Sequence, residues 1–121
     1  MNLLRDINVE QEEIMKTELV LPGIGALHAS ASEACALLKI LANEDRLLIL
    51  CELSKGTRNV GELEELLGIH QPTLSQQLTV LREENLVSTE RKGKYIYYSM
   101  ASLEAAKVME TLFSLYCKDH P

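Results

Sequence analysis

The sequence is poor in the residues that mark secreted and membrane proteins. It has no Trp, a single Phe, and three cysteines, which are too few for a disulfide-linked secreted scaffold. No apolar run approaches the ~18 residues of a membrane span, and the N-terminal segment lacks the apolar core of a signal peptide. We therefore expect a cytoplasmic protein that contacts no membrane.

Positive charge is also scarce. The chain has 12 Lys and Arg residues against 18 Asp and Glu residues, a net charge of -6, which taken alone argues against binding to DNA. The charge is unevenly distributed, however. Residues 70–98 contain four basic and three acidic side chains, a net +1, so the rest of the chain carries -7. The acidity therefore lies outside this segment, which remains a candidate for nucleic-acid binding.

The length of 121 residues fits one domain with a terminal appendage. Pro22, Gly23 and Gly25 end any helix that precedes them. We therefore expect an N-terminal helix or arm over residues 1–27 and a domain over residues 28–121. Apolar spacing within that domain predicts five helices. They start at Ala29, after Asn43, at Val60, at Pro72 and after Ser102, and the last one runs to about Cys117.

Two short helices and a hairpin follow one another in the middle of the domain. Pro72 is expected at the first position of the second helix, and Asn85 at its end. The residues after Asn85 alternate with a period of two around a turn at Lys92 and Gly93, which predicts a β-hairpin. The leucines expected to hold the two helices together are Leu63, Leu66, Leu67, Leu74, Leu78 and Leu81.

This order predicts a mainly α fold with a β-hairpin, the winged helix-turn-helix. The second helix then presents short or amide-bearing side chains that can hydrogen-bond to base edges, and the hairpin tip presents cations for phosphate. The candidate DNA-binding residues are Gln71, Thr73, Ser75, Gln76 and Thr79 on the helix and Arg91, Lys92 and Lys94 on the hairpin.

At this point the chain resembles a known family. Residues 41–50, the Val60-Gly61-Glu62-Leu63 stretch, residues 71–78 and the Tyr97-Tyr98 pair are similar to the ArsR/SmtB family of bacterial repressors, over roughly residues 34–117. The resemblance implies a homodimer formed through the helices at residues 29–42 and 102–117. It also implies an imperfect palindrome as the operator, and no enzymatic activity.

The same resemblance concerns what the protein senses. The stretch that carries thiols in metal-sensing members is here Asn59-Val60-Gly61, and the last helix has no His before His120. The sequence contexts of Cys51 and Cys117 are instead similar to the dithiol subgroup typified by BigR, SqrR and HlyU. This implies that persulfides or related oxidants join the two thiols in a disulfide or polysulfide bridge, which releases DNA, and that no cofactor is needed.

Other interpretations stay open from the residues alone. Each Cys can be a small buried apolar side chain, and we take Cys35 as packing. A metal-responsive repressor using Cys51 and Cys117, with His120 as a further candidate ligand, is the alternative function. A thiol oxidoreductase is weakly supported because there is no Cys-x-x-Cys, and the basic hairpin argues against a plain dimerisation module. Which thiol attacks first is not determined.

Overall fold

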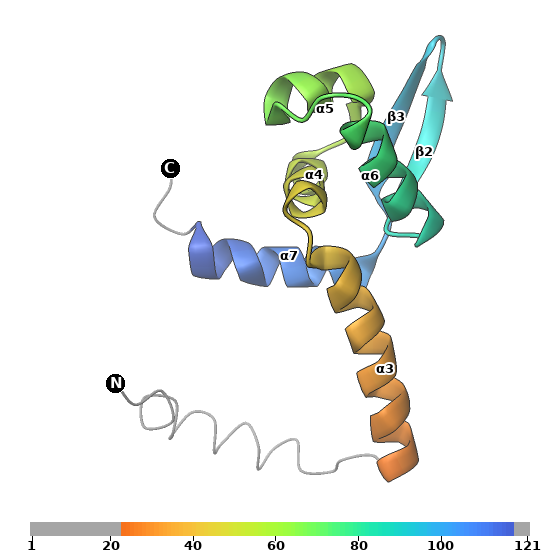
Figure 1. Cartoon of the computed structure of the whole chain (residues 1–121), viewed down its shortest axis with the longest axis vertical. Helices are drawn as coiled ribbons and strands as arrows, with labels where there is room; N and C mark the ends of the chain where they lie inside the picture. Colours follow the sequence, from red (N-terminus) through yellow and green to blue (C-terminus); the bar gives the residue numbers. More distant parts are fainter. Residues whose placement is uncertain (1–22, 118–121) are drawn as a thin grey trace. The chain divides into compact units, whose positions relative to one another are not determined.

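The structure, a computed structural model, describes residues 23–117. The expected N-terminal helix or arm lies mostly outside these residues. The chain divides into two compact units, and the boundary falls inside helix α3, between Cys35 and Ala36. The elements, labelled in Figure 1, are α3 (Ile24–Leu41), α4 (Glu44–Lys55), β1 (Arg58–Asn59), α5 (Val60–Leu67), α6 (Thr73–Glu83), β2 (Val87–Lys92), β3 (Tyr95–Met100) and α7 (Leu103–Tyr116).

Side-chain caps fix where several helices begin. The Asn43 side chain accepts a hydrogen bond from the Arg46 backbone N–H at 2.9 Å, and Ser102 Oγ accepts one from the Ala105 N–H at 3.0 Å. Both caps agree with the predicted helix starts. Helix α5 has a full capping box, because Asn59 and Glu62 each accept from the other's backbone N–H. This box places the predicted start of the third helix at Val60.

Two details of the predicted helix pair are wrong. Pro72 precedes α6 instead of occupying its first helical position, and it provides no side-chain cap. Leu66 does not help to hold α5 against α6, since it is 55% exposed. It lies on the outer side of α5, whereas Leu63, on the inner side, is fully buried. A short helix buries one narrow stripe, so apolar spacing over two turns overestimates what is covered.

The hairpin is present as predicted and belongs to a three-stranded antiparallel sheet. Strand β3 lies between β1 and β2, and Lys92 pairs with Tyr95 across the turn at Gly93, whose φ of 65° suits glycine. The sequence did not predict β1, in which Arg58 pairs with Tyr98. Two residues are too few to show a period of two. The β2–β3 hairpin is called the wing below.

Helix α4 is central in the second unit, because it packs against α5, α6, β3 and α7. Ile49 and Leu50 are fully buried, and they join a core that includes the three predicted leucines of α6. Helix α6 and the wing therefore rest directly or through one neighbour on α4. The buried residues of this core are Leu41, Ile49, Leu50, Leu53, Leu63, Ile69, Leu74, Leu78, Leu81, Leu86, Val87, Ala105 and Met109.

Helices α3 and α7 leave more of their large apolar side chains exposed than α4, in which Leu48 is 38% exposed. Leu103 on α7 is 67% exposed, and Ile24 on α3 is 72% exposed. Helix α3 is also, by length and composition alone, apolar enough to cross a membrane, contrary to the expectation that no segment is. One such helix near the N-terminus is weak evidence for a membrane span, because a helix covered by another protein chain has the same composition.

Candidate functional site

Helix α6 has one buried apolar side and one exposed polar side. Leu74, Leu78 and Leu81, at spacings of four and three residues, are buried against the core. Of the side chains that the sequence predicts as base contacts, Gln71 lies in the turn before α6 and not on the helix as expected, because α6 begins only at Thr73. The others lie on the rest of the helix. Thr73 is half-buried, and the remaining side chains are exposed. We call this set the reading face: Gln71, Thr73, Ser75, Gln76 and Thr79.

The first turn of the reading face is held by its own side chains. Gln71 Oε1 accepts hydrogen bonds from the Ser75 backbone N–H at 3.1 Å and from Ser75 Oγ at 2.6 Å. Gln71 thus satisfies a free N–H of the α6 start, which Pro72 leaves without a cap. Thr79 Oγ1 donates to the Ser75 carbonyl at 2.9 Å. Contact with a base through Gln71 Oε1 or through the Ser75 hydroxyl proton requires these internal bonds to open.

The three predicted cations of the wing lie together at its tip and are exposed. Lys92 Nζ stands 5.5 Å from the centre of the Tyr97 ring, and Lys94 Nζ stands 5.6 Å from that of Tyr95. Arg91 Nε donates to the Gly93 carbonyl at 3.2 Å. Exposed contacts between a cation and a ring stabilise by about 0.5–1 kcal/mol. These side chains are therefore loosely placed and can turn toward a phosphate at little cost.

Cys51 and Cys117 line one cavity of about 290 Å³ between α4 and α7. Cys51 lies in α4 and is half-buried, whereas Cys117 is exposed just after the last residue of α7. Both are free thiols. The lining has no Lys, Arg, His, Asp or Glu, so the thiols of Cys51 and Cys117 are its nucleophilic groups. The other lining residues are Leu47, Met109, Leu112, Phe113 and Tyr116.

The two thiols differ in their electrostatic setting. Burial raises the pKa of the Cys51 thiol, and negative charge on Cys117 and on Glu52 raises it further, while Lys55 acts in the opposite direction. Cys51 is therefore a protonated thiol near neutral pH and a weak nucleophile. Cys117 is the more accessible of the two to a reagent in solution.

No cluster of three metal-ligating side chains occurs among residues 23–117. His120, the further ligand of the metal alternative, lies outside the described residues. Cys35 belongs to the other compact unit and is exposed on α3. The described residues thus bring Cys51 and Cys117 together but assemble no metal site around them.

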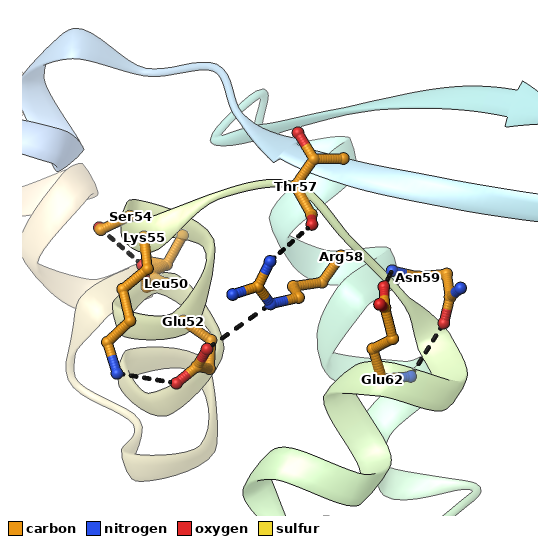
Figure 2. Close-up of polar contacts among 8 residues, drawn as sticks. All are labelled: Leu50, Glu52, Ser54, Lys55, Thr57, Arg58, Asn59 and Glu62. Atoms are coloured by element: carbon orange, nitrogen blue, oxygen red, sulfur yellow. Dashed lines mark hydrogen bonds and ion pairs between the residues drawn. The ribbon is translucent and has the colours of Figure 1, made fainter.

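Figure 2 shows a polar cluster around Glu52, the residue that follows Cys51, which sequence reasoning did not find. Glu52 Oε1 accepts from Lys55 Nζ at 3.0 Å, and Glu52 Oε2 lies 3.7 Å from Arg58 Nε in β1. Arg58 also donates to the Thr57 carbonyl at 3.0 Å. The spacing of Glu52 and Lys55 on one helix was a usable signal. No such sequence signal indicated the contact between Glu52 and Arg58, because that contact depends on where β1 lies.

Sequence reasoning also missed Arg46, in the first turn of α4. Its guanidinium donates to the Gln77 side chain in α6 and to backbone carbonyls at the end of α3. The first of these contacts joins residues that are 31 positions apart. No periodicity along one helix indicates such a pair.

Comparisons with known proteins agree with this geometry. Residues 43–89 match the model of the family described as bacterial regulatory protein, arsR family. The chain is 47% identical over 100 residues to the biofilm growth-associated repressor of Agrobacterium fabrum, covering 83% of each chain. The crystal structure of the transcriptional repressor BigR from Xylella fastidiosa matches with a TM-score of 0.73 and 41% identity. That match covers 80% of this chain and 96% of the other.

A second solved structure is that of reduced HlyU from Vibrio cholerae, which matches with a TM-score of 0.74 and 38% identity. The match covers 78% of this chain and 99% of the other. Both structural matches include the helix-turn-helix and wing as one winged-helix fold.

Proposed function

Since the chain belongs to the ArsR family of bacterial regulatory proteins and is a transcriptional repressor of the BigR and HlyU type, we propose that it is a dimeric, thiol-switched repressor. The reduced form binds operator DNA, and a bridge between Cys51 and Cys117 releases it. The observation that carries the proposal is that these two thiols, 66 residues apart in sequence, line one cavity.

DNA is contacted by two elements with different tasks. The reading face enters the major groove, where Gln76 and Gln71 can pair with adenine through their amides. The wing cations contact phosphate, which adds affinity without reading sequence. Both elements pack on the core of one unit. This arrangement supports the proposal because a fixed angle between helix and wing sets the register on the duplex.

The dimer forms through α3 and α7. The exposed apolar side chains of these helices include Leu38 on α3 and Leu103 and Leu115 on α7, each more than half exposed. Exposed apolar surface of this kind is typical of a protein interface. With a two-fold axis, the two reading faces enter successive major grooves about 34–36 Å apart on an imperfect palindrome.

The inducer is a persulfide, written R–S–SH, or a related oxidant. The Cys117 thiolate attacks the outer sulfur of the persulfide, and R–S⁻ leaves and takes up a proton. The product is a Cys117 persulfide. Cys51, once deprotonated, attacks the inner sulfur of that group, and HS⁻ leaves. Overall, two protein thiols are oxidised to a disulfide while one persulfide is reduced to R–SH and hydrogen sulfide. If a second persulfide first converts Cys51 to a persulfide in the same way, the outer sulfur of the Cys117 persulfide attacks the inner sulfur of the Cys51 persulfide. HS⁻ leaves, and the bridge contains three sulfurs.

Cys117 makes the first attack in this scheme because it is exposed, and because burial keeps Cys51 protonated. A raised pKa suits Cys51 to the second step, which is intramolecular and needs only a small thiolate fraction. A cytoplasmic location fits the scheme, since that compartment keeps thiols reduced until an oxidant arrives.

The test is DNA binding by reduced and persulfide-treated protein, using a palindrome selected from random duplexes. Treatment should weaken binding by about 5–150-fold, the usual range of allosteric coupling, and intact mass should show the loss of two hydrogens or the gain of sulfur. Cys51→Ser and Cys117→Ser should bind DNA but not respond.

Cys35→Ser is the matched control and should respond like the unaltered protein. Undiminished DNA binding after treatment contradicts the thiol switch. A stoichiometric zinc or cadmium site that requires Cys51 and Cys117, and whose occupation releases DNA, supports the metal-responsive alternative instead.

A further inference from the structure

Arg46 joins three elements of the second unit through one side chain. Its Nε donates to the Ile40 carbonyl at 2.6 Å and its Nη2 to the Lys39 carbonyl at 3.4 Å, both near the end of α3. Its Nη1 donates to Gln77 Oε1 in α6 at 2.8 Å. The planar guanidinium has five donors in a fixed fork, so it can hold several acceptors at once where an ammonium group cannot.

The two backbone contacts of Arg46 complete the end of α3. The last four carbonyls of a helix lack partners within the helix. Here Leu38 O accepts from the Ala42 N–H at 2.9 Å, and Leu41 O accepts from the Asn43 N–H at 2.8 Å. The Lys39 and Ile40 carbonyls are the remaining two, and the Arg46 guanidinium donates a hydrogen bond to each. A cation at the negative end of the helix dipole adds to this attraction.

The third contact ties that helix end to α6. Gln77 is half-buried and borders the buried leucine stripe of α6, next to Gln76 of the reading face. Because a guanidinium has only donors, Gln77 must turn its oxygen toward Arg46. Together with the packing of the buried leucines, this hydrogen bond therefore restricts the rotation of α6 about its own axis.

We propose that Arg46 is a positioning residue for DNA binding, which sets the orientation of the reading face through Gln77. The proposal has a second part, which rests on the thiol switch. Arg46 and Cys51 belong to the same helix, about 7.5 Å apart along its axis. A bridge that pulls Cys51 toward α7 moves α4, and the Arg46–Gln77 bond carries that movement to α6.

A competing route leads from α4 to the wing. Glu52 follows Cys51, and its carboxylate lies 3.7 Å from Arg58 in β1, which pairs with β3. The Arg58 contact is longer than the 2.8 Å bond between Arg46 and Gln77, and Glu52 is shared with Lys55. The bond between Arg46 and Gln77 is shorter and Gln77 is not shared, so it is the better mechanical link. Helix α6 is therefore the element that moves.

The central experiment measures the operator affinity of reduced Gln77→Met. Methionine keeps the length and helix propensity of glutamine but cannot accept from the guanidinium, and Arg46 still caps α3. We expect affinity to fall about 5–10-fold, within the usual range of coupling between sites, and the melting temperature to fall by only a few degrees, because one partly buried hydrogen bond is lost. Affinity equal to that of the unaltered protein overturns the proposal.

Rescue and a double-variant cycle separate positioning from a direct DNA contact of Gln77. Gln77→Glu restores the acceptor and should recover affinity, although it adds a negative charge that disfavours direct contact with DNA. Arg46→Lys should weaken binding alone but cause a clearly smaller further loss in the Gln77→Met background, where only its contacts with the end of α3 remain to be lost. Additive losses, or no rescue by Gln77→Glu, show that Gln77 acts on DNA by itself and contradict the proposal.

The second part of the proposal, that the Arg46–Gln77 bond carries the thiol switch to α6, is tested by the ratio of operator affinities before and after persulfide treatment. Gln77→Met should reduce that ratio at least about threefold, whereas Arg58→Gln, the matched control on the wing route, should leave it unchanged. The reverse pattern assigns the coupling to the wing and overturns this part. If the unaltered protein shows no response, the thiol switch and this part both fail, while the reduced-state affinities still decide whether Arg46 positions α6.

Discussion

The reading face and the thiol cavity are built in opposite ways, although both rest on the same core. Most of the reading face is exposed and polar, and its side chains bond to one another or to their own helix. The cavity is lined by apolar side chains, among which Met109 is only 2% exposed. Apart from Gln71, which caps the start of α6, changes in the reading face can thus alter the proposed operator contacts with little effect on stability, whereas changes in the cavity disturb the core itself.

The largest expected effect of this contrast is on DNA affinity. Gln76→Ala combined with Lys94→Ala removes the proposed base contact and the proposed phosphate contact from each subunit of the proposed dimer. We expect about a thousandfold weaker operator binding, or about 4 kcal/mol, in both the reduced and oxidised forms, with no change in melting temperature. Fluorescence anisotropy with labelled duplex measures the affinity.

Lys39→Ala is the control for this variant, because its ammonium group is exposed on α3 and only its backbone carbonyl takes part in a contact described above. It removes the same positive charge as Lys94→Ala but should bind DNA nearly normally. A similar loss in both proteins means that net charge, and not the wing, determines affinity.

The next effect is on stability and concerns the cavity wall. Met109→Ala should lower the free energy of unfolding by about 3 kcal/mol, because it removes a buried side chain and leaves a larger void. Urea denaturation measures the change. Lys107→Ala, two residues earlier on α7 and exposed, should change it by less than about 0.5 kcal/mol. Equal losses mean that the wall is not part of the core.

A smaller effect is expected from pH at Cys51. In a Cys35→Ser, Cys117→Ser protein, burial, the largest cause of the raised pKa of Cys51, is retained. Alkylation by iodoacetamide should therefore accelerate about tenfold per pH unit between pH 7 and 9. A midpoint below that of an ordinary thiol, about 8.5, contradicts the role of burial.

The raised pKa of Cys51 also makes the stability of the protein depend on pH. The unfolded thiol ionises at lower pH than the folded one, so the contribution to stability is fully present below the unfolded pKa. It is lost as the pH rises toward the folded pKa of Cys51. Denaturation midpoints of the same double variant between pH 7.5 and about 9.5 should decline accordingly, and Cys51→Ser in that background should remove this part of the decline.

The smallest effect is expected from a single wing cation. Lys92→Ala should weaken binding only about threefold and to a similar degree on every sequence. It should also reduce the slope of log affinity against log salt by about one per subunit. A salt titration tests this. A loss confined to one operator sequence instead assigns Lys92 to base contact.

The winged helix-turn-helix could be predicted from the sequence because its signals are local. Asn43, Ser102 and Asn85 mark helix ends through their own side chains or backbone angles, and the leucines of α6 have a clear period. The two-residue strand β1 and the exposure of Leu66 could not be predicted, because each depends on what neighbouring elements cover.

The candidate site shows the same division. The reading face and the wing cations follow from position on α6 and the hairpin. The pairing of Cys51 with Cys117 came from the family resemblance, and neither spacing nor composition provides the cavity or the burial that raises the pKa of Cys51. Arg46 was missed because its partner Gln77 is distant in sequence.

The hydrogen bonds from Ser75 to Gln71 have a consequence for how the repressor finds its operator. On an unrelated sequence these side chains lose nothing by keeping their internal bonds, so little holds the protein there beyond the wing cations and phosphate. The dwell time at each wrong position is then short, and the protein can survey many positions quickly by sliding and hopping. Under the proposed mode of binding, only a sequence that offers Gln71 and Ser75 better partners than each other favours opening these bonds, so the search ends at the operator.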